Sequence, residues 1–280
     1  MEPLYSDLYK LYSRCFPQYP VSQETFWQRL CPEKARVFAE YGQGLLIGCA
    51  LVHKASIPLL CVDREYRQQG VGARLLASAQ GYILGTGARQ ITLGCGEHYL
   101  LQGVPEDPPA PVRFFQRHGY TAPWTSVNME LDLKSFSLKT AAIPPAPENV
   151  AFRMARVTDA DALLAAVEDA QASWVPIFAS CQDPVLLAVA REQIMGFQIL
   201  SPSGGHFLRS GHIVGSIGCV GVVPGARNQG IGLRMVAQGA QWLKDQGCTL
   251  VELRYTWLES WYGRLGFRTV SRQWMGEKSR

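Results

Sequence analysis

The chain has 280 residues, which is long for one compact domain and comfortable for two domains of about 140 residues each. Hydrophobic residues make up 47% and charged residues 18%, a composition typical of globular cores and not of disordered chains. The formal net charge of +4 is small, and no block of Lys and Arg indicates a nucleic-acid partner.

The termini, apolar runs and cysteines give further exclusions. No apolar run reaches the roughly 18 residues of a membrane span, and residues 1–10 lack the features of a secretory signal. We therefore expect a cytoplasmic protein with no membrane partner. The cysteines are spaced singly, without a C-x-x-C pair or a zinc-like Cys/His cluster, so we expect reduced thiols and no metal site. They are Cys15, Cys31, Cys49, Cys61, Cys95, Cys181, Cys219 and Cys248.

The first half begins with helical stretches and continues with apolar strand-like segments. These are Arg36–Tyr41, Leu45–Val52 and Ile57–Val62. A glycine-rich turn follows and runs into a helical pattern whose apolar residues share one face. Residues 96–111 then form a Gly/Pro-rich loop. This half has no obvious opening strand before Arg36, so that edge is either absent or supplied by the other half.

A proline-dense segment separates the halves, and the second half repeats the order of the first. Residues 134–149 predict a semi-rigid linker. The segment 152–156 predicts an opening strand, and Thr158 or Asp159 caps a helix that runs to Ala170. Further strands are expected at Val185–Ala190, Met195–Leu200 and Ile213–Val223. We therefore divide the chain into domains at 1–133 and 150–280.

An internal repeat is the clearest feature of the sequence. Residues 67–77 read RQQGVGARLLA and residues 227–237 read RNQGIGLRMVA, with six of eleven positions identical. Downstream, FFQRHGY at 114–120 matches WYGRLGF at 261–267, and in each a short helix ends at a Gly suited to the left-handed C′ position. The extra 13 residues between turn and aromatic motif in the first half lie in its Gly/Pro-rich loop. The chain is therefore a tandem of two related units.

The repeated turn has the properties of an anion site. Its glycines permit a tight turn and close backbone approach. Because it opens a helix, its unpaired N–H groups converge where the helix dipole is positive. The leading Arg can add charge-assisted hydrogen bonds. Neither copy has the G-K-[S/T] of a Walker A loop or the third glycine of a dinucleotide fingerprint.

With these motifs the sequence resembles the GCN5-related N-acetyltransferase (GNAT) family in both halves, with a layout similar to that of two-domain acetyltransferases of the mycothiol synthase type. The resemblance implies an α/β fold in which each unit is a twisted mixed sheet flanked by helices. It implies acetyl-CoA as cofactor, held between the splayed fourth and fifth strands. It also implies that an N–H near a bulge at Cys219 to Val222 polarises the acyl carbonyl.

The resemblance also assigns cofactor-binding residues to each half. In the second half these are Val222, Val223, Arg227, Asn228, Gln229, Gly230, Ile231, Gly232 and Leu233. In the first half they are Val62, Arg67, Gln68, Gln69, Gly70, Val71, Gly72 and Ala73.

The aromatic motif distinguishes the halves chemically. The family commonly protonates its thiolate leaving group with a Tyr of this motif, which is Tyr262 here. The first half has Phe115 at that place, which has no proton to give. The competing interpretation of Tyr262 is a packing aromatic. For the general base, Glu252 in the expected fifth strand is our candidate, with Glu259 as a second and solvated or structural carboxylates as the alternative.

Several other features keep two interpretations. The lone residues His98, His206 and His212 favour structural roles. The aromatics from 253 to 274 could line an acceptor pocket or form core, and the segment from Glu97 to Pro105 could be a lid.

We expect an acetyl-CoA-dependent N-acetyltransferase acting on a primary amine of a small molecule or peptide, as monomer or homodimer. A non-catalytic acyl-CoA-binding module is the alternative, and the first copy could also be a pure scaffold.

Overall fold

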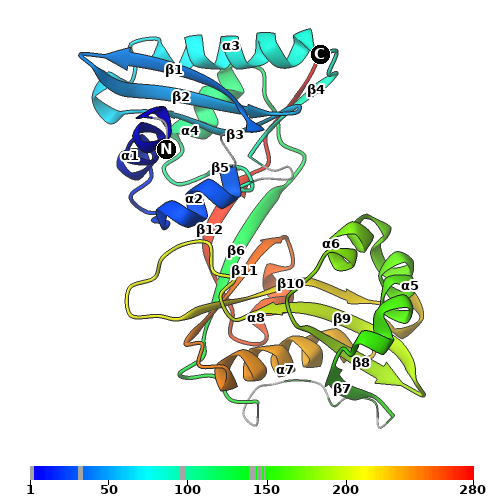
Figure 1. The fold of residues 1–280 in the computed structure, drawn as a ribbon. Coiled ribbons are helices and arrows are strands. Elements are labelled where there is room, and N and C mark those ends of the chain that lie inside the picture. The colour runs from blue at the N-terminus through cyan, green and yellow to red at the C-terminus, as the bar shows by residue number, and fades with distance from the viewer. Residues whose placement is uncertain are drawn as a thin grey trace. The chain divides into compact units, whose positions relative to one another are not determined.

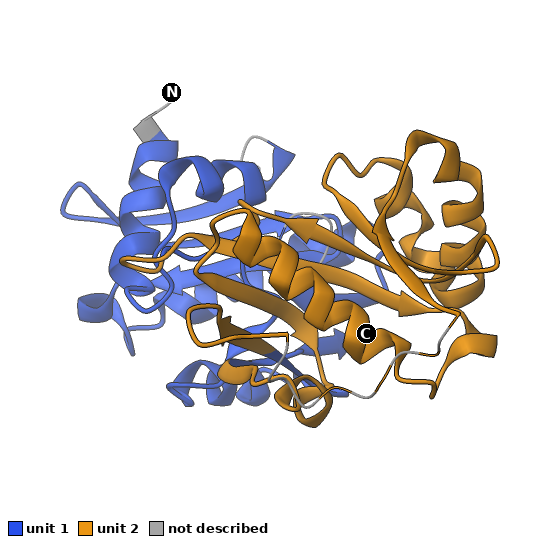
Figure 2. Cartoon of the chain, turned by 90° about the horizontal axis from the view of Figure 1, so that it is seen from below, with its two compact units in different colours: residues 1–127, 206–208, 271–280 blue, residues 128–205, 209–270 orange. Residues whose placement is uncertain are grey.

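The protein has an α/β fold with two mixed sheets, as the sequence predicts. A computed structural model describes residues 3–30, 34–94, 99–138 and 149–280, together with 143, 145 and 147. Cys31, Cys95, His98 and part of the expected linker lie outside these residues. Figure 2 shows two compact units that exchange segments: unit 1 comprises residues 1–127, 206–208 and 271–280, and unit 2 comprises residues 128–205 and 209–270.

The sheet of unit 1 has the strand order β1-β2-β3-β4-β13. Its members are β1 (Arg36–Gly42), β2 (Leu45–His53), β3 (Ser56–Val62), β4 (Gln90–Leu93) and β13 (Glu277–Ser279). β1, β2 and β3 pair antiparallel, whereas β3 and β4 pair parallel. β13, from the chain's end, pairs antiparallel with β4. β1 forms the edge of this sheet, so among the described residues no opening strand precedes it, in line with the sequence of the first half.

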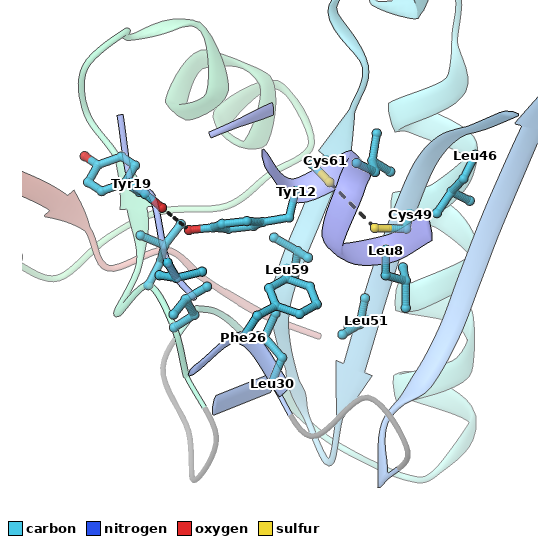
Figure 3. Packing of buried hydrophobic residues seen from close by; sticks show 14 of the residues in the cluster. Leu8, Tyr12, Tyr19, Phe26, Leu30, Leu46, Cys49, Leu51, Leu59 and Cys61 are labelled. Atoms are coloured by element: carbon cyan, nitrogen blue, oxygen red, sulfur yellow. Dashed lines mark hydrogen bonds between the residues drawn. The ribbon is translucent and has the colours of Figure 1, made fainter. Parts of the chain in front are cut away.

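Helices cover both faces of this sheet (Figure 1). They are α1 (Pro3–Cys15), α2 (Gln23–Leu30), α3 (Val71–Gly85) and α4 (Ala110–Arg117). On one face, apolar residues of α1 and α2 pack with alternate residues of β2 and β3 (Figure 3), among them Tyr12, whose hydroxyl donates to Tyr19 O at 2.7 Å. The predicted apolar face of α3, from Val71 to Ile83, is buried against the other set.

The second sheet has the order β5-β12-β6-β11-β10-β9-β8-β7. Its members are β5 (Val104–Pro105), β6 (Thr125–Asp132), β7 (Ala151–Met154), β8 (Val185–Ala190), β9 (Gln193–Ser201), β10 (Val214–Val222), β11 (Leu250–Thr256) and β12 (Arg268–Trp274). β7 is the predicted opening strand, and β8 has the predicted bounds. β6, from the first half of the chain, lies between β11 and β12, an exchange that strand patterns do not reveal.

The helices of unit 2 are α5 (Ala160–Gln171), α6 (Val175–Ala179), α7 (Ile231–Asp245) and α8 (Glu259–Gly263). The apolar face of α5 packs with Leu187 and Phe197, while a Cβ at Gly196 would contact Met235 of α7, so α5 and α7 cover opposite faces. Asp159 occupies the N-cap position of α5, as predicted, but its side chain makes no capping bond to that helix. It accepts the Arg156 N–H at 2.7 Å and so closes the 3-10 turn Val157–Asp159 that precedes α5. None of the helices described has both the length and the apolarity needed to cross a bilayer.

The described cysteines are all free, as predicted. Cys49, Cys61 and Cys248 are buried, and Cys15, Cys181 and Cys219 are partly buried. Cys49 and Cys61 lie opposite each other on β2 and β3, with their sulfurs 3.6 Å apart (Figure 3).

Candidate active site

The two glycine-rich turns share one backbone conformation. Gln68 and Asn228 both have φ 62°, and the residues before the helices, Gly70 and Gly230, have φ 80° and 78°. A left-handed residue at this point suits Gly, because it has no Cβ to clash. The sequence repeat is therefore also a repeat of geometry.

The leading arginine of each turn has the same role. Arg67 Nε donates to Val62 O at 2.9 Å, and Arg227 Nε donates to Val222 O at 3.1 Å. Each arginine thus ties its turn to the strand before it. The guanidinium of Arg227 also donates to Ala170 O at 3.3 Å, so part of its donor capacity is used by the fold.

The start of α7 has the free donors of an anion site. The first bond into the helix runs from Arg234 N–H to Gly230 O at 3.2 Å. Across the described part of the chain, the amides of residues 228–233 donate to no other backbone group. Such amides at the positive end of a 15-residue helix attract an anion. The expected pyrophosphate donors are therefore together and available.

The strand before this turn, β10, is bulged and open to solvent. Its register with β9 slips by one residue between Gly218 and Gly221, and Cys219 within the bulge has φ 48°. Most of β10 from Gly218 onward is only partly buried, and a Cβ built on Gly218 would meet no atom within 4 Å. Parallel pairing with β11 covers only Val214–Ser216. The two strands thus pair at one end, and the bulge lies beyond it.

The matching strand of the first half, β3, differs at each of these points. Counting back from the turn, Pro58 and Leu59 stand where β10 has Gly218 and Cys219. β3 pairs with β2 without a shift from Leu59 to Val62, and its register shift lies farther from the turn, between Leu59 and Ser56. Pro58 and Leu59 are buried. Leu59 belongs to the same buried cluster as Leu100 and Leu101 of the extra loop. The described end of that loop is therefore core of unit 1.

Tyr262 lies in α8 and is buried. Its ring packs edge-on against Trp261 and Phe267, with centroids 4.7 and 5.8 Å away. Its hydroxyl forms no hydrogen bond to any residue that the structure describes. Burial raises the pKa of Tyr262 well above its usual range, and the nearby Cys219 thiol adds to the shift. Burial also raises the pKa of Cys219 to about 11. Both groups are thus protonated at neutral pH.

The corresponding ring in the first half is Phe115, as predicted. It packs edge-on against Tyr120 at 5.6 Å, just as Tyr262 packs against Phe267. The two aromatic pairs have similar geometry, but the hydroxyl is on the first ring in Tyr262–Phe267 and on the second ring in Phe115–Tyr120. Tyr120 Oη accepts a hydrogen bond from Gln80 Nε2 at 3.2 Å, which satisfies it within the core of unit 1.

The two candidate bases have different surroundings. Glu252 is buried in β11, opposite Ser216 in the parallel register, and its carboxylate pairs with Arg254 at 3.2 Å. Glu259, in the first turn of α8, accepts a hydrogen bond from Thr269 Oγ1 at 2.6 Å. Glu252 therefore lies near the last strand pair before the bulge, whereas Glu259 lies at the helix that carries Tyr262.

The remaining sequence candidates have structural settings. His206 is buried next to the rings of Tyr99 and Phe207, and His212 Nδ1 lies 3.2 Å from Thr249 Oγ1. The aromatics between 253 and 274 divide into two sets. Tyr262, Phe267 and Trp274 are core, while Tyr255 and Trp257 are 43% and 69% exposed.

The resemblance predicts the bulge around Cys219 to Val222, but the open space at Gly218 is not predicted from the sequence. The signal was present as two glycines, Gly218 and Gly221, within an otherwise apolar strand pattern. Glycine inside a strand often marks a bulge or the close approach of a ligand.

A family model described as an acetyltransferase (GNAT) domain matches residues 33–122 and again residues 182–269. These two matches cover more than half of the chain, and the chain belongs to this family as a tandem member. A search of curated protein sequences gives no match.

Solved structures show the same tandem fold. A GCN5-related glucosamine N-acetyltransferase region of a fungal multi-domain GH3 β-N-acetylglucosaminidase superposes with a TM-score of 0.83 at 19% identity, over 99% of this chain. This chain spans 37% of that protein's length. A GCN5-related N-acetyltransferase from Sphaerobacter thermophilus gives 0.76 at 20% identity, over 98% of this chain and 91% of its own. A tandem GNAT protein from the clavulanic acid biosynthesis pathway gives 0.70 at 14%, over 98% and 94%.

Proposed function

We propose that the protein is an acetyl-CoA-dependent N-acetyltransferase that acetylates a primary amine, with its active site in unit 2. The observation that carries the proposal is the combination of an open, bulged β10 with the buried Tyr262 and the free amides at the start of α7. The family membership supports the reaction class. The acceptor, a small molecule or a peptide, is part of the proposal.

The residues of unit 2 fit acetyl-CoA, which when bound supplies an acetyl group activated as a thioester. The amides from Asn228 to Leu233 and the guanidinium of Arg227 would hold its pyrophosphate. The backbone of Val222 and Val223 and the open space at Gly218 would hold its extended arm. The turn of the first half, from Arg67 to Ala73 after Val62, stays a second candidate anion site, but its strand is buried.

Two groups in unit 2 would act on the reacting atoms. An N–H at the Cys219 bulge is displaced from the ladder and can donate to the acyl carbonyl oxygen, which stabilises negative charge there. Tyr262 keeps its proton at neutral pH because burial raises its pKa, so Oη–H can donate to a thiolate leaving group. A free thiol has a pKa of about 8.5, well below that of the buried Tyr262. Tyr262 is therefore expected to donate a hydrogen bond to the thiolate and not to transfer its proton fully.

Glu252 is our proposed base. Since its side chain is only 3% exposed and paired with Arg254, it would take the proton of an incoming ammonium through an intervening water. Glu259 is the competing candidate. Replacing each by Gln separates them: the variant that lowers kcat most and shifts the acidic limb of the pH profile identifies the base.

The experiment that tests the function is an amine panel incubated with acetyl-CoA and protein, followed by mass spectrometry of acetylated products. Glucosamine belongs in the panel because the fungal structural neighbour is described as acting on it. Tyr262→Phe should lower kcat by roughly 10²-fold or more while acetyl-CoA still binds. Tight acetyl-CoA binding without any product would contradict the proposal and favour a non-catalytic acyl-CoA-binding module.

A further inference from the structure

The segment between β11 and α8 exposes two large aromatic side chains to solvent. Trp257 is 69% exposed and Tyr255 is 43% exposed, and Leu258 beside them is 44% exposed. Isolated exposed apolar residues are ordinary, whereas exposed apolar residues grouped together are a feature of binding surfaces. We call Tyr255 and Trp257 the aromatic platform.

The aromatic platform is fixed to the helix that carries Tyr262. Leu258 N–H donates to Thr256 Oγ1 at 3.1 Å, between the two platform residues and the helix. The carbonyl of Leu258 in turn accepts the N–H groups of Trp261 and Tyr262, each at 3.1 Å. Leu258 therefore connects the platform to the helix of Tyr262 through three hydrogen bonds, one to the Thr256 side chain and two within the backbone.

The backbone of Tyr255 is in the left-handed region, with φ 60°. A bulky aromatic rarely adopts this conformation, because its Cβ crowds the following carbonyl. The conformation turns the chain out of β11 before Trp257. The sequence thus keeps an unfavoured residue at a position where Gly or Asn would fold more easily.

The openness of the platform limits what it can bind. Apolar ligands are usually enclosed in concave pockets, whereas a ligand on this surface would keep much of its own surface in water. The ligand must therefore be hydrophilic and yet have a flat apolar face that an aromatic ring can cover. A pyranose sugar has both, with C–H groups on one face and hydroxyls at its edge.

The charge of a neighbouring residue further restricts the ligands that the platform can bind. Glu259 follows the platform directly and its carboxylate is only partly buried. An ammonium group is favoured both by a carboxylate and by the faces of aromatic rings. A sugar that carries an amino group meets each requirement of this segment.

We propose that Tyr255 and Trp257 bind the acceptor as a stacking platform and that the acceptor is an amino sugar. This inference rests on the proposed function and names its substrate class. In the acceptor complex, the C–H face of the sugar lies against Trp257, and the amino group is directed toward the helix of Tyr262 and Glu259.

The platform is tested first by binding, without turnover. Saturation-transfer difference NMR of glucosamine with the wild-type protein should show the strongest transfer to ring C–H protons, and Trp257→Ala should remove it. Tyr41→Ala is the matched control, since Tyr41 is a 55% exposed aromatic on β1 of unit 1. It should leave the signal unchanged. A signal that survives Trp257→Ala overturns the platform.

Kinetics separate the platform from the chemistry. Trp257→Ala should raise KM for glucosamine by about 3- to 10-fold, the range of one aromatic contact, with kcat and KM for acetyl-CoA unchanged. Trp257→Phe should restore most of the affinity. KM for ethanolamine, an amine without a sugar ring, should not change. An equal rise for both amines, or a rise in KM for acetyl-CoA alone, overturns the proposal.

Failure of the two proposals gives different results. If no amine in the panel is acetylated, the proposed function fails, and a glucosamine NMR signal that depends on Trp257 still supports the platform. If glucosamine is acetylated equally well by the wild type and Trp257→Ala, the function holds and the platform is wrong.

Discussion

The turns Arg67–Ala73 and Arg227–Leu233 share their left-handed glycine, the tie of the arginine to the preceding strand and a free helix start. The strands that lead into them do not match. β10 bulges at Cys219 and is only partly buried, whereas β3 keeps its register with β2 from Leu59 to Val62 and is buried at Pro58 and Leu59. The turn is therefore a local structure that forms whether or not an open strand lies beside it.

The physical reason is the range of the interactions. The turn is held by its own glycines and by bonds to residues a few positions away. The cleft needs the bulge, the space at Gly218 and Tyr262 from a helix 30 or so residues downstream. The first half lacks these features, so it lacks the chemistry proposed for unit 2, although its turn has the same conformation.

The largest expected effect comes from placing a negative charge in each turn. Gly230→Asp should weaken acetyl-CoA binding by about 10- to 1,000-fold, because a carboxylate near a pyrophosphate costs roughly 1–4 kcal/mol at close range. Gly70→Asp should leave affinity unchanged. Isothermal titration calorimetry of both variants measures this. The two sites have nearly equal φ, so the backbone strain of the substitution is matched.

The two outcomes of that comparison are distinct. Two binding events in the wild type, or weaker binding with Gly70→Asp, would show that the first turn holds the cofactor despite its buried strand. Loss of binding only with Gly230→Asp would make the first half a scaffold for the second.

A second prediction concerns the two buried tyrosines of the aromatic pairs, Tyr262 in unit 2 and Tyr120 in unit 1. Burial raises the pKa of both Tyr262 and Tyr120, so the folded protein holds these protons at pH values where the unfolded chain, with phenols near about 10, releases them. Stability therefore falls as pH rises above about 10, by up to roughly 1.4 kcal/mol per pH unit for each such group.

Tyr262→Phe should flatten this alkaline slope more than Tyr120→Phe. Burial is the main cause of the raised pKa of Tyr262 and Cys219 adds to it, whereas the hydrogen bond from Gln80 partly offsets the effect of burial on the pKa of Tyr120. Urea unfolding of the variants between pH 9 and 11, about one unit either side of a free phenol's pKa, gives the slopes. Equal slopes for wild type and Tyr262→Phe would contradict the buried position of this phenol.

The smallest expected effect concerns one ion pair in each unit. Hydrogen bonds from Arg153 and from the Arg156 N–H lower the pKa of Asp159 to about 2, and Arg74 lowers the pKa of Glu40. Carboxyls with lowered pKa stabilise the fold above their unfolded pKa, near about 4, and lose that contribution as pH falls through the folded pKa. Solvent screening keeps both contributions small.

Asp159→Asn should reduce the acid sensitivity of unfolding below about pH 4 more than Glu40→Gln. Asp159 joins the opening strand β7 to α5, an element that unit 1 lacks, and receives three hydrogen bonds. Urea midpoints of both variants at pH 7 and near pH 3 provide the measurement. A larger effect from Glu40→Gln would reverse the predicted order.

Much of the fold was accessible from local patterns. The strands of the first half, the apolar face of α3, the N-cap position at Asp159 and the left-handed glycines at 119 and 266 were all predicted and are present. These features depend on residues close together in the chain. The contrast between Tyr262 and Phe115 could also be predicted, because aligning two motifs needs no tertiary information.

The tertiary structure decided what local patterns cannot encode. Alternation of apolar residues indicates β6 as a strand, but not that it lies between β11 and β12. β13 has no apolar residue, so no such pattern marks it as a strand or pairs it with β4. Strand order depends on pairings between distant residues, which hydrophobic periodicity does not specify. For the same reason the sequence by itself determined two anion-binding turns, whereas packing over β3 and the bulge in β10 decided which of them adjoins an open strand.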